Sequence, residues 1–307
     1  MIRYFPFTPS FDLKMGTTPM KESDFTVEAD EHYLKEIGLK ASLLEQDHNY
    51  YYAELPGCKT SAWEVVMTVL NQLVQQSPDK FILKNEGDAL CFWNLTIGER
   101  TLFKPGQDQS LPYAPLDWIG RQVQEDLILL NKSGEIVAGQ LCFPSGWDLH
   151  EKLGKQFMEV HAPLPPVSLP MIQSANKLVE RLPLGKPIAR NNWGFRLGDQ
   201  LDMSSKYSAV YRKRLEEEIP LMTEDEFGRK MFVRVEHQTL SRLTTGDVLF
   251  TIHTYHSPLE AEVQDTNRAA NMLSFLEGTP KELLDYKIIT PYYSRLISYL
   301  RSNLKNG

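Results

Sequence analysis

Hydrophobic residues recur at helical spacing in several parts of the chain. The clearest case spans Thr60–Gln76, whose apolar side chains form one stripe: Trp63, Val66, Met67, Leu70, Leu73 and Val74. Ser61 precedes Glu64 by three residues, which is the spacing of a capping box, so we expect Ser61 to be the N-cap. The same periodicity predicts further helices at 30–44, 171–182, 267–276 and 280–304.

Other stretches alternate between apolar and polar residues, as strands do. Residues 81–83 and 89–95 are typical of short strands, and residues 126–143 predict an antiparallel hairpin. Residues 230–255 predict a second, longer hairpin. Antiparallel hairpins interspersed with helices indicate an α+β fold, with helices wrapped around an antiparallel sheet.

The first strand of the long hairpin has an unusual polar side. Arg234, Glu236 and Gln238 share one face, whereas Val233 and Val235 share the other, together with His237. One interpretation is a solvent-exposed face with an Arg–Glu pair of little energetic value. The other is a polar row that lines a pocket, where such groups donate hydrogen bonds or accept a proton. The pattern alone leaves both open.

The stretch 141–167 joins a strand end, a sharp turn and a helix. Asp148 is a suitable N-cap for a helix over Leu149–Val160, and His161 follows directly. Proline residues then stiffen the exit from the helix: Pro163, Pro165 and Pro166. This order predicts an imidazole held at the C-terminal end of a helix.

His161 has two interpretations. Histidine commonly binds the last free carbonyl groups of a helix. It is also the commonest protein ligand for metals. No second ligand stands at metal-site spacing from His161. Haem iron requires only one protein ligand, whereas structural zinc requires four.

Composition narrows the class of protein. The 307 residues allow one large domain or two small ones. The chain has 33 Lys and Arg against 40 Asp and Glu, a net charge of −7, which argues against a nucleic-acid partner. No apolar run is long enough to span a bilayer, and the N-terminus lacks a secretory pattern. Three separate cysteines without a CxxC pair are typical of a cytoplasmic protein.

Several stretches resemble the haem-dependent oxidative N-demethylase alpha-subunit family. They occur in order between about residues 90 and 260: Val123–Leu127, Cys142–Trp147, Glu151–Gly154, Val160–Pro163, Asn192–Trp193, Arg234–Leu240 and Leu249–Ile252. The resemblance implies a PAS-like sheet with N- and C-terminal helical extensions. We therefore expect an N-terminal arm and helices at 1–88, a PAS-like haem-binding core at 89–260 and closing helices at 261–307, in one compact domain.

The resemblance also implies roles for particular residues. His161 is expected to be the axial ligand of a haem b. Lys152 and Arg190 are candidate partners for the haem propionates because of their charge. Trp147 and Trp193, in two of the matching stretches, are further candidates for cofactor contact.

The same resemblance implies that the polar row is catalytic. Arg234, a permanent cation, suits the negative charge that develops on reduced oxygen. Glu236 is expected to hold Arg234 or the ammonium group of a substrate, and Gln238 belongs to the same row. His237 and His253 stand where we expect arginine in the family, so each removes a permanent positive charge and leaves the choice of substrate open.

The expected activity is oxidative N-demethylation of a small secondary amine, such as dimethylamine, with O2. The electrons are expected to come from NADPH through flavin and 2Fe–2S centres. The chain has neither a cysteine cluster nor a glycine-rich dinucleotide fingerprint, so we expect these carriers in a separate reductase subunit.

Two other functions fit the same features. One is a haem-binding PAS-like sensor of gas or redox state, and the other is a ligand-binding member of the family without catalysis. A sensor normally passes its signal to an output domain or coiled coil. Both ends of this chain are predicted to form packed helices, which favours the enzyme or a partner-dependent module.

Overall fold

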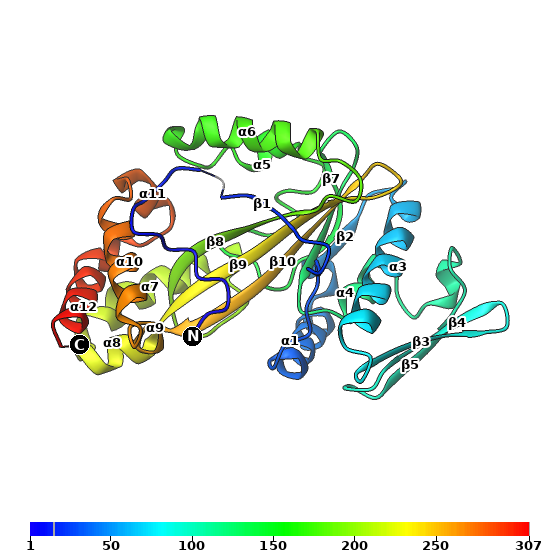
Figure 1. The fold of residues 1–307 in the computed structure, drawn as a ribbon, viewed down its shortest axis with the longest axis horizontal. Coiled ribbons are helices and arrows are strands. Elements are labelled where there is room, and N and C mark those ends of the chain that lie inside the picture. The colour runs from blue at the N-terminus through cyan, green and yellow to red at the C-terminus, as the bar shows by residue number, and fades with distance from the viewer. Residues whose placement is uncertain (15, 307) are drawn as a thin grey trace.

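The computed structural model describes residues 1–14 and 16–306, which form two antiparallel sheets surrounded by helices (Figure 1). The larger sheet has the strand order β1-β8-β9-β10-β6-β7-β2, and the smaller has the order β3-β4-β5. The strands are β1 (Thr18–Pro19), β2 (Tyr52–Glu54), β3 (Phe81–Glu86), β4 (Ala89–Asn94), β5 (Glu99–Phe103), β6 (Asp126–Leu130), β7 (Ile136–Gln140), β8 (Ile188–Leu197), β9 (Met231–Arg242) and β10 (Val248–Pro258). The predicted α+β class and both predicted hairpins are confirmed.

The remaining regular elements of the described chain are helices. They are α1 (Tyr33–Gln46), α2 (His48–Tyr51), α3 (Lys59–Gln76), α4 (Pro115–Gly120), α5 (Phe157–Val160), α6 (Leu169–Glu180), α7 (Ser208–Glu218), α8 (Glu224–Lys230), α9 (Leu259–Glu262), α10 (Thr266–Glu277), α11 (Lys281–Tyr286) and α12 (Tyr293–Asn306). Short 3-10 helices are η1 (Asp108–Ser110), η2 (Pro166–Ser168), η3 (Ser205–Tyr207), η4 (Ile219–Leu221) and η5 (Thr290–Tyr292).

The two faces of the larger sheet pack against different parts of the chain. One face, which we call the helical face, carries Leu129 and Leu249 against α3 and α4, and Val235 against the C-terminal helices. The opposite face carries Ile128 and Leu240 against the segment 141–187, which includes α5 and α6. Figure 1 shows α5 and α6 along one side of β8–β10, with α3 and α4 towards one end of the strands and α10–α12 towards the other.

The helix predicted at Thr60–Gln76 is present as α3, but its predicted capping box is wrong. The N-cap is Cys58, which makes no side-chain cap. Ser61 instead donates to the Asp247 carboxylate (2.6 Å), and the Glu64 carboxylate accepts the backbone N–H of Thr245 (3.1 Å). Both side chains therefore bind the β9–β10 turn, whose free N–H groups need acceptors as much as a helix end does.

The helix predicted over Leu149–Val160 is largely absent. Only α5, a single turn before His161, is helical there. Gly154 adopts a left-handed conformation (φ 77°), and its N–H donates to the carbonyl of Ile136 (2.8 Å). The N–H of Phe157 likewise donates to Gly134 (3.1 Å). The chain thus pairs with the start of β7, which removes the bonds that a longer helix would need.

A buried carboxylate fixes the path from β7 towards the opposite face. Asp126 accepts the backbone N–H groups of Cys142 (2.7 Å) and Phe143 (2.8 Å). Burial raises the pKa of Asp126 to about 6, although Lys40 and these two N–H groups favour the charged form. Lys40 is itself fully buried and donates to three carbonyl groups in the segment before β6.

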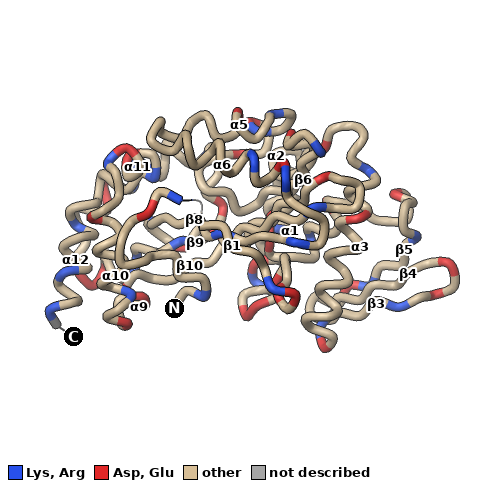
Figure 2. The backbone as a smooth tube through the Cα atoms, turned by 45° about the horizontal axis from the view of Figure 1, so that its top comes forward, with Lys and Arg blue, Asp and Glu red and all other residues tan. Residues whose placement is uncertain are grey.

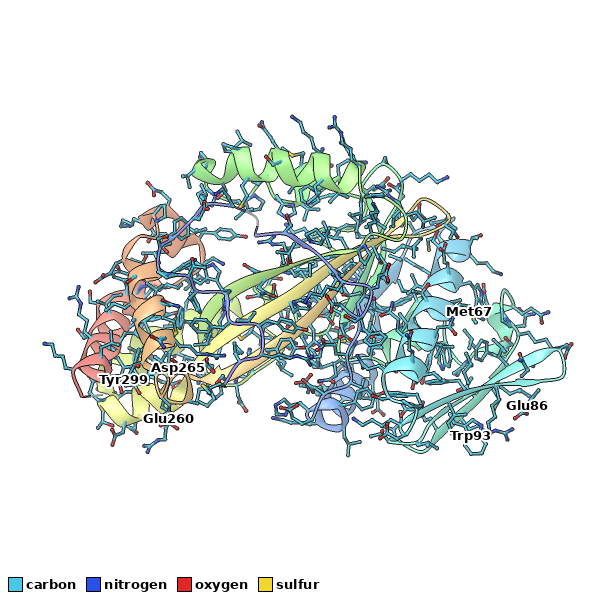
Figure 3. All side chains as sticks on the ribbon, viewed as in Figure 1. Met67, Glu86, Trp93, Glu260, Asp265 and Tyr299 are labelled. Carbon is cyan, nitrogen blue, oxygen red and sulfur yellow. The ribbon has the colours of Figure 1, made fainter. Side chains whose placement is uncertain are left out.

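The three-part division at 88 and 260 stays a prediction. The first boundary falls in the β3–β4 turn and the second within α9. The small sheet packs its inner face on α3, whereas Trp93, on its outer face, is 39% exposed. Figure 3 shows Trp93 and Glu86 pointing away from the body of the protein.

The helical face contains a buried cation. His253 Nδ1 contacts the Glu125 carboxylate (2.7 Å), and Nε2 lies 3.6 Å from Asp30. Burial opposes charge on the imidazole, but the two carboxylates outweigh it and raise the pKa of His253 to about 10. The histidine at position 253 therefore carries a positive charge at neutral pH, as the arginine expected there in the family would. His237 differs, because burial lowers the pKa of this imidazole, stacked on Tyr4, to about 4.

We expect the raised pKa of His253 to make stability depend on pH. A base whose pKa is higher in the folded state stabilises the fold fully below its unfolded pKa and loses this contribution as pH rises through the folded value. The difference in free energy of unfolding between wild type and His253→Gln should fall by about 1–3 kcal/mol between pH 6 and pH 9. Urea denaturation measures it, and the exposed His32→Gln is the control; a constant difference would contradict the pairing.

Candidate functional site

The polar row of β9 lies inside the protein. Arg234, Glu236 and Gln238 are only 2%, 5% and 9% exposed, so the interpretation as a solvent-exposed face is wrong. The strand register places Asn192 and Arg190 of β8 beside Glu236 and Gln238. We call these five residues the polar face of the sheet. Their burial is what a pocket lining requires.

Arg234 is bound on almost every side. Its terminal nitrogens donate to the carbonyl groups of Leu201 (3.0 Å), Phe143 (2.6 Å) and Pro144 (3.2 Å), and one of them also to the neutral imidazole of His256 (3.0 Å). Its Nε lies 3.7 Å from the Glu236 carboxylate and has no hydrogen-bond partner among the described residues. Only this edge of the guanidinium is left for a ligand.

Glu236 has one occupied and one free oxygen. Oε2 accepts hydrogen bonds from the side-chain amides of Asn192 (3.1 Å) and Gln238 (3.0 Å). Oε1 is buried and accepts no hydrogen bond in the described part of the chain. A buried carboxylate oxygen without a donor costs free energy, which a bound N–H group would recover.

His161 has the orientation that a ligand needs. It follows α5, and its Nδ1 lies 2.8 Å from the carbonyl of Phe157. A carbonyl only accepts, so Nδ1 carries the proton and Nε2 keeps its lone pair. Burial lowers the pKa of this imidazole, and Arg190 and Lys152 lower it further, so it is neutral at pH 7. Histidines that bind metals typically donate a hydrogen bond from the ring nitrogen that does not contact the metal, as Nδ1 of His161 does here.

Two cations accompany His161. Lys152 donates to the carbonyl of Val160 (3.1 Å), and burial lowers the pKa of its ammonium. The Arg190 side chain makes no hydrogen bond to any described residue, and its Nε is fully buried. Burial also lowers the pKa of Arg190, whereas Glu236 raises it. An unpaired guanidinium beside an imidazole with a free lone pair fits a ligand that is both a metal complex and an anion.

The structure separates the two tryptophan candidates. Trp147 packs, half-buried, with the apolar cluster beneath α6, on the side of the sheet that His161 covers. Trp193 lies on the helical face, in edge contact with Phe7 (5.5 Å) and Phe275 (5.2 Å). The structure thus brings His161, Lys152 and Arg190 together with the polar row, but not Trp193.

The two arginines nearest Glu236 differ in their ionic partners. Arg234 lies 3.7 Å from Glu236 and is also stabilised by the charges of Asp126 and Asp202. Arg190 makes no salt bridge to any described residue, and Glu236 only partly offsets its burial. Elsewhere Lys and Arg are interspersed with Asp and Glu, as Figure 2 shows. A largely buried guanidinium without a salt bridge, such as that of Arg190, requires a counter-anion. The two carboxylates of a haem b would supply one.

Sequence reasoning missed three of the site residues. Asn192 stands in one of the matching stretches and at the correct alternation in β8, so it had a signal. Arg196 follows the same alternation. Lys287 had none, because its partner Asn192 lies 95 residues earlier in the chain.

A separate cavity lies on the other side of β8. It measures about 600 Å³ and is lined by residues of the N-terminal arm, β8, β9 and α3. Its lining includes Tyr4, Asp24, Glu28 and His237, as well as Arg190 at the strand edge. Neither His161 nor Glu236 lines it. The cavity is therefore distinct from the site at the polar face.

The fold and the polar face define an α+β protein whose buried donors suit one imidazole-bound, anionic cofactor. No group of three or more His, Cys, Asp or Glu side chains in the described ranges is arranged to hold a bare metal ion. Residues 16–297 match the family described as haem-dependent oxidative N-demethylase, alpha subunit-like, and the chain belongs to this family. The family resemblance expected from the sequence motifs is thereby confirmed.

Membership supports the broad class of function. The family is named for haem-dependent oxidoreductase chemistry and for an alpha subunit, a chain that acts with partner subunits. Over residues 1–14 and 16–306, no helix combines the length and apolarity needed to cross a membrane.

We expect Arg234 to be required for stability. Arg234→Met leaves the carbonyl group of Leu201 without a donor, that of Phe143 with only the long contact from Thr254 (3.5 Å), and Glu236 without its closest cation. This should lower the free energy of unfolding by about 3–5 kcal/mol. Urea denaturation of the cofactor-free protein measures the loss. Arg229→Met, at an exposed position of α8, is the matched control and should change stability by less than about 0.5 kcal/mol. An Arg234 variant as stable as this control would contradict the structural role.

Proposed function

We propose that the protein is the haem-binding chain of an oxidative N-demethylase that acts on a small secondary amine. The observation that supports this most is the pairing of His161, whose Nε2 is free, with the unpartnered Arg190 guanidinium. In this proposal His161 is the axial ligand, and Arg190 and Lys152 bind the propionates of a haem b. Family membership supplies the class of cofactor.

Glu236 is the proposed anchor for the substrate. A secondary amine is an ammonium ion at neutral pH, and its N–H groups suit the free Oε1 of Glu236. Gln238 and Asn192 hold the other oxygen and so fix the direction of this acceptor. The Nε edge of Arg234 lies 3.7 Å from Glu236 and would stabilise the negative charge that develops on oxygen. These contacts orient the substrate and exclude water from it.

The haem supplies oxygen activation when it is bound. For dimethylamine the balanced reaction consumes the amine, O2, two electrons and two protons, and it yields methylamine, formaldehyde and water. The three cysteines of this chain are buried and unpaired, so they offer no set of thiolates for an iron–sulfur centre. We propose that a partner subunit delivers the electrons, from NADPH through flavin and 2Fe–2S carriers.

The first test is the absorption spectrum of the protein titrated with hemin. We expect a stoichiometric Soret band that shifts on reduction with dithionite. His161→Ala should weaken hemin binding at least about tenfold and change the spectrum, because the axial ligand is lost. His150→Ala, eleven residues earlier and exposed, is the matched control. An unchanged spectrum in His161→Ala would remove this residue from the iron.

The second test separates substrate binding from cofactor binding. Glu236→Gln keeps the shape of the side chain but removes its charge, so kcat/KM for dimethylamine should fall about 10–100-fold while the Soret band is retained. Amine-dependent oxygen consumption and formaldehyde release, with a chemical reductant as electron source, are the measurements. Equal turnover in the variant would show that the amine binds elsewhere. Hemin binding without any amine oxidation would instead favour a sensor.

A further inference from the structure

Lys287 reaches the polar face from the C-terminal part of the chain. It follows α11, and its ammonium donates to the Asn192 side chain (3.1 Å) and to the carbonyl of Trp193 (2.7 Å). Nζ also lies 4.3 Å from the centre of the Trp193 ring. Beyond Ala189 no strand pairs with this edge of β8 in the described chain, so Lys287 occupies an otherwise open strand edge.

Asn192 connects Lys287 to Glu236. Its side-chain oxygen accepts from Lys287, and its side-chain nitrogen donates to Glu236 Oε2 (3.1 Å). An ammonium only donates and a carboxylate only accepts, so the two contacts together fix the orientation of the amide. The carboxylate held in this way keeps Oε1 free of protein donors.

The backbone at this point is strained. Ile288 has φ 59°, and it is the one residue other than glycine with positive φ in the described chain. A β-branched residue in this region is a true outlier, which persists only where the surroundings hold it. Here the N–H of Ile289 donates to Leu284 (2.9 Å), and Arg196 donates to the carbonyl of Lys287 (3.3 Å). The strained turn directs Lys287 onto β8.

Lys287 also changes charge in the physiological range. Burial lowers the pKa of its ammonium to about 7, and the Arg196 and Arg190 guanidinium groups of β8 lower it as well. The Glu236 carboxylate of β9 acts in the opposite direction. Protonated Lys287 is a stronger donor to Asn192 than the neutral amine.

We propose that Lys287 is a positioning residue, which through Asn192 holds Glu236 with Oε1 presented to the amine substrate. The inference rests on the proposed role of Glu236 and extends it to a residue outside the sheet. It makes affinity for the amine depend on a side chain that touches neither the substrate nor the cofactor.

The test compares Lys287→Met with Lys287→Arg in the hemin-loaded protein. Lys287→Met should raise KM for dimethylamine about tenfold and leave hemin affinity unchanged, because a charge-assisted hydrogen bond is lost from the substrate anchor. The KM of the wild type should rise above pH 7. Lys287→Arg stays charged, so its KM should be lower than that of Lys287→Met and should remain constant up to pH 9. Lys281→Met, on the exposed surface of α11, is the matched control.

A second measurement needs no haem. The side-chain amide resonance of Asn192 should titrate with a midpoint near pH 7 in the wild-type protein and stay constant in Lys287→Met. Loss of hemin binding by the wild type would overturn the proposed function, but this titration would still test Lys287. Either of two results would overturn the positioning role: an Asn192 amide resonance that does not change with pH, or an unchanged KM in hemin-loaded Lys287→Met.

Discussion

The guanidinium of Arg234 determines how the segment 141–187 packs on the larger sheet. It lies near the start of β9 and binds the carbonyl groups of Phe143 and Pro144, which follow β7, and of Leu201, which precedes α7. Those carbonyl groups have no strand to pair with, so a buried five-donor cation is one of few side chains able to satisfy them together. These contacts also hold residues 143–144 and 201 against β9, because those residues cannot shift without leaving buried carbonyl groups unpaired.

Charge has a different arrangement on each face of the sheet. On the helical face, His253 is a cation balanced by Glu125 and Asp30, and a hydrogen bond from Tyr4 satisfies Glu28. Buried atoms without hydrogen-bond partners occur on both faces: Glu125 Oε2 and His253 Nε2 on the helical face, and Arg190 Nε, Arg234 Nε and Glu236 Oε1 on the polar face. On the helical face these atoms belong to an ion pair, whereas the Arg190 side chain has neither a hydrogen bond nor a salt bridge to a described residue, which supports a ligand site at the polar face.

The sequence predicted the fold class, both hairpins and most helices, because their apolar periodicity extends over many residues. It also placed Arg234, Glu236 and Gln238 on one face, since alternation in a strand is strict. It failed where long-range contacts decide: Gly134 and Ile136 bind the segment 154–157 and prevent a long helix, and the β9–β10 turn captures Ser61 and Glu64. Burial of the polar row likewise depends on a segment some 70 residues away, which no local pattern encodes.

The strand order has a consequence for the timing of synthesis. β6 and β7 leave the ribosome long before β9 and β10, yet β10 stands between β6 and β9 in the finished sheet. Until β10 emerges, the edge of β6 that pairs with β10 is open, and the sheet that faces His161 is incomplete. Lys287 follows later still. The segment 141–187 therefore cannot pack on a complete sheet until β9 and β10 have been synthesised, and the proposed haem could bind only after that point.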